Sequence, residues 1–220
     1  MSNKFLKFAT LSLAVVAMLA ATVAPALAST TEAGRKPPVP PTPVVTPLSA
    51  AEIAGLQFMR EEEKLAHDVY VTLYAQWGAT TFNSIAASEA NHTAQIANLL
   101  TKYGIADPAA GNGVGVFTDP ALQALYNQLI AQGSVSLSAA LNVGGLIEET
   151  DIVDIQTRLA SVTHSDIAQV YNNLISGSYN HLRGFVSALA GIGVTYAPQI
   201  LDVAPYNSII GGTSGRGGRR

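Results

Sequence analysis

Apolar side chains recur at alternating intervals of three and four residues along four segments of the chain, which is the period of one buried helical face. The first segment follows Ser49 and Glu52, which have the spacing of a capping box at a helix start, and it ends at Gly78. The second segment follows Thr81, a candidate N-cap, and ends at Gly104. These two patterns predict two long amphipathic helices in the first half of the folded region.

Two further segments with the helical period follow a long connection. Residues 104–118 are rich in glycine and proline, and Asp119 then precedes a short predicted helix over about 120–132. We expect a third long helix over about 136–162 and a fourth after residues 163–166, which have a second capping-box pattern. None of the four long segments shows the alternation of a strand. The fold class is therefore all-α, and a four-helix bundle with one long crossover that contains a short extra helix fits the order of the segments.

The two ends of the chain differ in composition from its middle. Residues 1–28 begin with lysines, continue through an apolar stretch and end in Ala-Leu-Ala, so we expect a secretory signal peptide cleaved after Ala28, with a retained membrane anchor as the alternative. Residues 29–47 are proline-rich and predict a linker, and residues 206–220 are rich in glycine and arginine and predict a disordered tail. The folded domain is expected over residues 48–205. A cleaved signal would place it in the periplasm, at the cell-envelope exterior or in the medium, without a stable membrane span.

Composition and charge limit the chemistry that this domain can perform. The chain has no cysteine, which excludes disulfides, Cys-ligated zinc, iron–sulfur clusters and thiol nucleophiles. A metal would therefore need carboxylates and the four histidines as ligands. The net charge of the chain is −3, but the expected domain holds five basic and fourteen acidic residues. A basic groove for nucleic acid is not expected.

Ionisable residues interrupt the apolar face near the middle of each long helix. They are Glu63 in the first helix, Glu89 and His92 in the second, Glu148 and Asp151 in the third, and His181 in the fourth. An unpaired buried carboxylate costs several kcal/mol, so four of them facing one core require cations. Two divalent metal ions would balance the four carboxylates, and both imidazoles would bind as neutral ligands. Carboxylates mixed with imidazole favour iron, with manganese or zinc as alternatives.

The sequence around these residues resembles a known family. The runs EEEKLAHDVY (61–70), SEANHTAQI (88–96), IEETDIVDIQ (147–156) and GSYNHLRGF (177–185) are similar to those of DUF2202, a domain family of unknown function placed in the ferritin-like superfamily. The resemblance implies a ferritin-like four-helix bundle and a carboxylate-bridged di-iron site of the rubrerythrin kind. It implies little about the reaction, because a fold does not determine a function.

One departure from the ferritin-like pattern concerns the fourth helix. Ferritin-like sites carry Glu-x-x-His there, whereas this chain has Ser178 three residues before His181. Asp151, one turn after Glu148, resembles the second carboxylate of rubrerythrin-like proteins and would restore the missing ligand. It equally fits an exposed helix position, in which case one metal position is weak or empty and mononuclear binding is the alternative.

Adjacent acids leave the register of the ligands open. Glu62 would replace Glu63 if the first helix were rotated about its axis. Only one of Glu148 and Glu149 is expected to face inward, and the apolar residues that follow select Glu148. His67 lies one turn after Glu63 and is a weaker candidate, because its charged neighbours indicate the rim of the bundle.

The function expected from these features is that of an exported metal-binding protein. Its di-iron or iron–manganese carboxylate centre would act as a ferroxidase or reduce oxygen or peroxide, so its partners would be metal ions with O2 or peroxide. The alternative is a non-catalytic module that binds metal or a surface partner and has lost part of the di-metal site, and a third is a structural bundle without metal. A homo-oligomer is compatible with the sequence, but periodicity does not reveal symmetric surfaces.

Overall fold

The computed structural model describes residues 47–212, and within that range the chain forms six α-helices and no strand. The helices are α1 (Ala50–Trp77), α2 (Thr80–Tyr103), α3 (Pro120–Gly133), α4 (Leu137–Leu159), α5 (Ser165–Gly191) and α6 (Val203–Gly211). The prediction of an all-α fold is confirmed. The expected signal peptide (1–28), nearly all of the expected linker and the last residues of the tail lie outside the described residues. Among the helices that are described, none combines the length and the hydropathy needed to cross a membrane.

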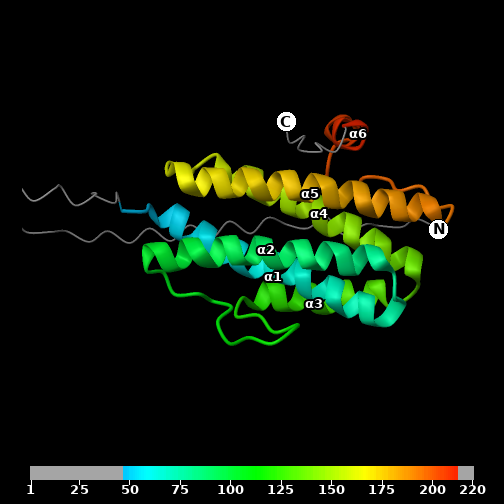
Figure 1. Cartoon of the computed structure of the whole chain (residues 1–220), viewed down its shortest axis with the longest axis horizontal. Helices are drawn as coiled ribbons and strands as arrows, with labels where there is room; N and C mark the ends of the chain where they lie inside the picture. The colour runs from blue at the N-terminus through cyan, green and yellow to red at the C-terminus, as the bar shows by residue number, and fades with distance from the viewer. Residues whose placement is uncertain (1–46, 213–220) are drawn as a thin grey trace, which may run out of the picture. The chain divides into compact units, whose positions relative to one another are not determined.

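The four long helices lie side by side as two antiparallel pairs (Figure 1). Helix α1 packs against α2 and helix α4 packs against α5, while contacts of α1 with α4 and of α2 with α5 join the two pairs. Helix α3 lies in the long connection between α2 and α4 and packs against α1 and α4, and α6 packs against α5. The connection between the second and third long helices thus contains a short extra helix, as the sequence predicts.

Several predicted helix ends are present in the structure. Ser49 and Glu52 form the capping box at the start of α1, with Ser49 Oγ accepting from the Glu52 backbone N–H at 3.2 Å. Gly78 and Gly104 end α1 and α2 in the left-handed conformation, each with a φ of 65°, where glycine has no steric penalty. Asp119 caps α3 by accepting from the first backbone N–H groups of that helix.

Three predicted helix ends differ from the structure. Helix α2 begins at Thr80 after Ala79, so Thr81 lies inside the helix and does not cap it. Helix α4 ends at Leu159 rather than near residue 162. The predicted capping box at residues 163–166 does not form, because α5 has no side-chain cap from its own residues.

A carboxylate from another helix holds the two residues that precede α5. Glu52 Oε1 accepts from the backbone N–H groups of Thr163 at 2.9 Å and His164 at 3.1 Å, and it contacts His164 Nδ1 at 2.8 Å. Asp166 instead pairs with Lys102 of α2 at 2.8 Å. The local capping signal is therefore overridden by two tertiary contacts, which spacing along the chain does not encode.

The folded region continues past residue 205, where the sequence analysis placed its end. Helix α6 buries Tyr206 and Ile209, so the expectation of disorder from residue 206 is wrong for residues 206–211. The segment before α6 is held by Glu149 of α4, which accepts from the Tyr196 hydroxyl at 2.7 Å and from backbone N–H groups including that of Leu201 at 2.7 Å. Two apolar anchors and one buried acceptor thus extend the domain.

A polar layer divides the apolar core into two clusters. On α1, Leu56 and Met59 belong to one cluster and Tyr70 and Leu73 to the other, with Glu63 between them. Helix α5 has the same order along its inner face, and the antiparallel α2 has the reverse order, with the ionisable residues between the two clusters in each case. The ionisable residues therefore lie at one level of the bundle, enclosed by apolar side chains on both sides.

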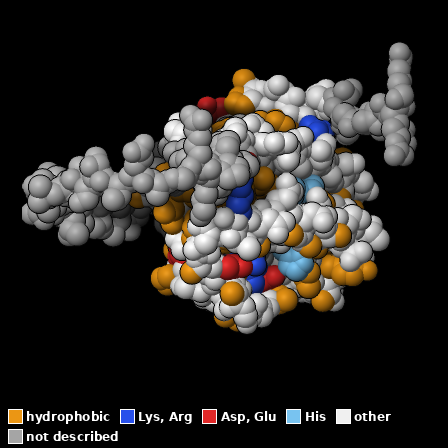
Figure 2. Space-filling model, turned by 60° about the vertical axis from the view of Figure 1, so that its left-hand side comes forward, with side chains coloured by type: hydrophobic (Ala, Val, Ile, Leu, Met, Phe, Trp, Pro, Cys, Tyr) orange, Lys and Arg blue, Asp and Glu red, His pale blue; other side chains and the backbone are white. Residues whose placement is uncertain are grey.

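The surface carries charges of both signs close together. On the face shown in Figure 2, acidic side chains lie beside basic ones rather than in a patch of one sign. Lys102 with Asp166 at 2.8 Å and Arg60 with Asp107 at 3.1 Å are ion pairs of this kind. Nine of the fourteen acidic residues of the domain are buried, and four of these, Glu63, Glu89, Glu148 and Asp151, lie in the polar layer.

Candidate metal centre

The structure brings together the six residues that the sequence singles out. They are Glu63 of α1, Glu89 and His92 of α2, Glu148 and Asp151 of α4, and His181 of α5. Each is buried, with at most 7% of its surface exposed. Since each lies on the inner face of a long helix, the positions follow from the helical period that predicts them.

Glu89 lies between the two histidines. Its Oε2 is 2.9 Å from His92 Nδ1, and its Oε1 is 2.6 Å from His181 Nδ1. The two imidazole rings have centroids 5.3 Å apart. One ligand atom from each of the three residues lies within 4.8 Å of the other two, which is compact enough for one metal ion to contact all three.

Each histidine also faces a carboxylate of its own. His92 Nδ1 is 3.2 Å from Glu63 Oε2, and His181 Nδ1 is 3.5 Å from Glu148 Oε2. The arrangement therefore consists of two half-sites, each with one imidazole and one carboxylate, that share Glu89.

Asp151 adds a fourth carboxylate on the side of α4 and α5. Its Oδ2 accepts a hydrogen bond from Ser178 Oγ, and the charges of Glu63, Glu148 and Glu89 act on its side chain. Asp151 is 5% exposed, so the alternative of an exposed helix position is wrong. A carboxylate thus stands beside the position at which the fourth helix carries serine.

Several buried atoms of the cluster lack a hydrogen bond from any described residue. They are Glu63 Oε1, Glu89 Oε2, Asp151 Oδ1 and His181 Nδ1. Glu89 Oε2 and His181 Nδ1 do approach charged neighbours, but not in hydrogen-bond geometry. A buried polar atom left unsatisfied costs about 1–3 kcal/mol, so Glu63 Oε1 and Asp151 Oδ1, which also lack an ion pair, call for a further partner. Carboxylate oxygens and an imidazole nitrogen are ligand atoms suited to iron, manganese or zinc, and the residues fit such a metal.

The carboxyl groups resist ionising together. Burial raises the pKa of Glu63 to about 8; the contact with His92 opposes this rise but is outweighed by burial, and the charge of Glu89 adds a smaller increase. Burial, together with neighbouring carboxylates, also raises the pKa of Glu148 and raises that of Asp151 well above its usual range. Glu89 is the exception: burial is outweighed by its contacts with both histidines, which lower its pKa to about 2.

The histidines have the opposite behaviour. Burial disfavours the charged form of His92, but its contacts with Glu63 and Glu89 outweigh burial and raise its pKa to about 11. The same balance, with Glu148 and Glu89, raises the pKa of His181 to about 10. Without another cation, the positive charge beside these carboxylates therefore comes from protons bound to the two histidines. A divalent cation supplies that charge and releases the protons, which is how metal binding couples to pKa.

Two further residues orient the cluster and were not identified as site residues from the sequence. Tyr70 donates from its hydroxyl to Glu148 Oε1 at 2.5 Å, and Ser88 Oγ lies 2.9 Å from His181 Nε2. A hydrogen bond at the far nitrogen fixes which nitrogen of an imidazole faces a metal, so Ser88 directs Nδ1 toward Glu89. Spacing along the helix could have identified Ser88, since it lies one turn before His92 on the same face of α2.

Glycines near the cluster make room for rings. A Cβ at Gly177 would overlap the imidazole of His92, and a Cβ at Gly144 would overlap the ring of Phe185. Both positions lie inside helices, where glycine is destabilising relative to alanine. Both glycines therefore allow close packing, and at Gly177 the neighbour is a site residue.

Neighbouring candidates lie outside the cluster. Glu62 is also buried, but it interacts with Asp154 and Arg158 of α4. Burial, together with nearby carboxylates, raises the pKa of Glu62 well above its usual range. His67 Nδ1 contacts Asp68 Oδ1 at 2.9 Å and takes no part in the cluster. The register that places Glu63 inward is therefore the one observed.

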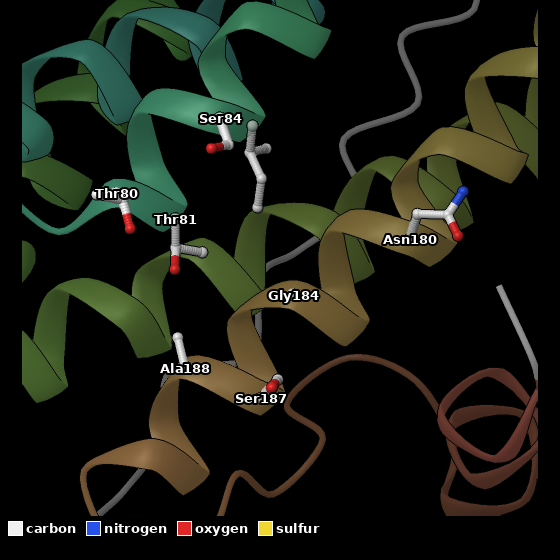
Figure 3. A pocket seen from close by; sticks show the side chains of 8 residues that line it. Thr80, Thr81, Ser84, Asn180, Gly184, Ser187 and Ala188 are labelled. Atoms are coloured by element: carbon white, nitrogen blue, oxygen red, sulfur yellow. The ribbon is translucent and has the colours of Figure 1, made fainter.

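A groove lies between the start of α2 and the second half of α5 (Figure 3). Its volume is about 370 Å³. The lining residues are Thr80, Thr81, Ser84, Ile85, Asn180, Gly184, Ser187 and Ala188. None of these lining residues carries a charge. Asn180 precedes His181 in the sequence and Ser84 lies one turn before Ser88, but His181 and Ser88 are not among the lining residues.

Comparison with known proteins identifies relatives without a described activity. Residues 52–213 match the family described as "Uncharacterized protein domain (DUF2202)". The chain is 43% identical over 174 residues to the uncharacterized protein MJ0754 of Methanocaldococcus jannaschii, covering 79% of this chain and 94% of that protein. The crystal structure of the hypothetical protein MJ0754 matches with a TM-score of 0.76 and 41% identity, over 79% of this chain and 99% of that chain.

Proposed function

Because the chain belongs to the DUF2202 family, whose description assigns no activity, we propose its function from its own residues. It is an exported, ferritin-like metalloprotein whose buried centre binds two divalent metal ions, with iron as the native metal and manganese or zinc as substitutes. The centre serves the oxidation of Fe(II) or the reduction of oxygen or peroxide.

The observation that carries this proposal is the position of Glu89 between two matched half-sites. Glu63 with His92 and Glu148 with His181 each provide one carboxylate and one imidazole, and Glu89 faces both imidazoles through different oxygens. A carboxylate that presents one oxygen to each of two sites is suited to bridge two metal ions. Asp151, with one oxygen free of hydrogen bonds, would be the second carboxylate to hold the metal ions.

The arrangement of the helices supports a ferritin-like bundle. Helices α2 and α4 run in the same direction, because the long connection with α3 returns the chain to the end at which α2 begins (Figure 1). Two antiparallel pairs joined by one such crossover are the topology of ferritin-like bundles, in which facing helices supply the metal ligands.

The protein's own residues hold the ligand set in place. Ser88 keeps His181 Nδ1 directed at Glu89, Tyr70 holds one oxygen of Glu148, and Ser178 holds one oxygen of Asp151. Apolar side chains on both sides of the layer exclude water. Bound iron would supply one-electron redox chemistry that these side chains themselves cannot perform.

The groove between α2 and α5 suits a small uncharged reactant. Hydroxyl and amide groups line it together with small apolar residues, and no lining residue is charged (Figure 3). Molecular oxygen and hydrogen peroxide are neutral and small enough to enter. The uncharged lining of the groove therefore supports an oxygen species as the reactant. The excess of acidic residues in the domain argues against nucleic acid as a partner.

The experiment that tests this function is iron titration of the purified chain under oxygen. The wild-type protein is expected to oxidise Fe(II), or to consume peroxide, faster than the same concentration of free iron, and a Glu89→Gln variant is expected to lose that rate. A wild-type protein that binds iron but shows no rate above free iron would overturn the redox function.

A second candidate function is metal binding without turnover. The observation that favours it is the short hydrogen bond of Ser178 to Asp151, which occupies one oxygen of the carboxylate needed as second bridge. Tight uptake of a single metal ion per chain without oxidation of Fe(II) would support this candidate over the first.

A further inference from the structure

Glu62 is a buried carboxylate that the proposed centre does not use. It is 7% exposed, and its Oε2 has no hydrogen bond from any described residue. Its side chain makes hydrogen-bonding contact with Asp154 and electrostatic contact with Asp151, both on α4. Two carboxylates in contact inside a protein repel one another unless a proton or a cation lies between them.

Asp151 connects Glu62 with the centre. Its charge acts on Glu62, the charges of Glu63, Glu148 and Glu89 act on it, and its Oδ1 is free of hydrogen bonds. Asp154, one turn further along α4, is partly exposed. The carboxylates therefore continue from the surface of α4 through Glu62 to the buried centre.

Arg158 is a basic group beside the row of carboxylates formed by Asp154, Glu62 and Asp151. It is in electrostatic contact with Glu62, and its guanidinium carbon lies 3.8 Å from the centroid of the Phe58 ring. Its Nε is buried without a hydrogen bond, so the guanidinium is stacked and only partly engaged by acids. One arginine lies beside three carboxyl groups, those of Glu62, Asp151 and Asp154, so the acidic groups of this row outnumber the basic ones.

We propose that Glu62 and Asp154 form an entry path on which a divalent cation binds in passing before it reaches the Glu89–His92–His181 cluster. This inference rests on the proposed metal-binding function. Carboxylate oxygens replace the water ligands that a hard cation loses as it enters a buried site, and Glu62 supplies an oxygen without another partner midway. Asp151 then passes the cation to the centre.

The rate of Co(II) loading tests this path, because bound Co(II) is followed by its visible absorbance in the full chain without any turnover. Loading in Glu62→Gln is expected to be about tenfold slower or more, as carboxylates that steer a cation raise its association rate by 10-fold or more. Loading in Asp154→Asn is expected to slow by a smaller factor. The final number of Co(II) ions per chain is expected to equal that of wild type in both variants.

The matched control is Asp166→Asn, which removes an acid that pairs with Lys102 on a different helix end. Its loading rate is expected to equal that of wild type. Should Glu62→Gln fail to fold by circular dichroism, Asp154→Asn carries the test, since Asp154 is partly exposed.

Two results would overturn the entry path. One is wild-type loading rates in both variants. The other is loss of a Co(II) ion from the final stoichiometry at an unchanged rate, which would make Glu62 a ligand of the centre. Wild-type protein that takes up no Co(II) at all would instead overturn the proposed function, and the entry path with it.

Discussion

Ser178 of α5 donates a hydrogen bond from its hydroxyl to Asp151 of α4. Ser178 is fully buried, and its Oγ also lies 3.1 Å from the carbonyl oxygen of Leu174. In the ferritin-like bundle that we propose, this serine takes the place of a glutamate, and Asp151 of the neighbouring helix would supply the carboxylate instead. The serine and the carboxylate that would replace its missing counterpart are therefore joined by one hydrogen bond.

This pair gives the first prediction. Asp151→Asn is expected to remove one bridging carboxylate and to weaken the binding of one of two metal ions. Ser178→Ala keeps the carboxylate but frees its orientation, and loss of such an outer hydrogen bond typically costs about 10–100-fold in metal affinity. Metal titration by calorimetry checks both variants. Wild-type binding in Asp151→Asn would show that this carboxylate is not a ligand.

The second prediction concerns the space left by a glycine. Gly177→Ala places a methyl group against the imidazole of His92, so the ring must move and metal affinity should fall by about tenfold or more. Gly191→Ala is the matched control, since a Cβ there meets nothing within 4 Å in the same helix. Metal content after equal exposure to Fe(II) compares the two. Equal content would mean that His92 does not bind the metal.

The third prediction concerns the pH dependence of stability. Burial opposes ionisation of Glu52, but its contacts with His164, Ser49 and Thr163 outweigh burial and lower its pKa below the usual value of 4.5. A lowered pKa in the folded state gives stability that is present above that usual value and is lost as the pH falls below it. Glu52→Gln should therefore lower the free energy of unfolding at pH 7 by about 1–3 kcal/mol.

Urea unfolding across a pH series measures this effect. The difference between wild type and Glu52→Gln should be constant from pH 7 to about pH 5 and should shrink at lower pH. A difference that stays constant down to pH 3 would exclude the ionised Glu52 as its source.

The fourth prediction concerns the segment that leads to α6. Glu149→Gln keeps the shape of the side chain but removes the charge that accepts from the backbone N–H groups of Gln199, Ile200 and Leu201. Hydrogen exchange should accelerate over residues 196–211 by an amount that corresponds to about 1–3 kcal/mol of local stability. Exchange in α1 should stay unchanged. Acceleration throughout the protein would indicate a global rather than a local role.

The helical period predicts the inner face of each long helix but not how many other faces are covered. Glu61, Glu62 and Glu63 are consecutive, and one helical face cannot contain all three, yet all are buried. The reason is tertiary: α1 contacts α2, α3 and α4, and Glu61 accepts from the backbone N–H of Asp119 at 2.9 Å at the start of α3. The spacing therefore identified Glu63 and could not show where Glu61 and Glu62 lie.

Contacts between distant segments explain what else the sequence did not reveal. Glu149 was expected to face outward, because an adjacent acid faces inward, but the returning C-terminal segment covers it. Glu52 serves two helix starts at once, one in its own helix and one in α5. Both pairings join residues that are far apart in the chain, and no local pattern records them.

The central claim is that Glu89, His92 and His181 bind metal, and metal stoichiometry in single variants tests it most directly. Wild-type chain purified without chelators is expected to bind two Fe(II) ions and to gain about 2.7 kcal/mol of stability at metal concentrations of one hundred times Kd. His92→Ala and His181→Ala should each lower affinity by about tenfold or more and reduce the metal-induced rise in Tm, while His67→Ala should match wild type. Equal metal content and an equal rise in Tm in wild type, His92→Ala and His181→Ala would contradict the claim.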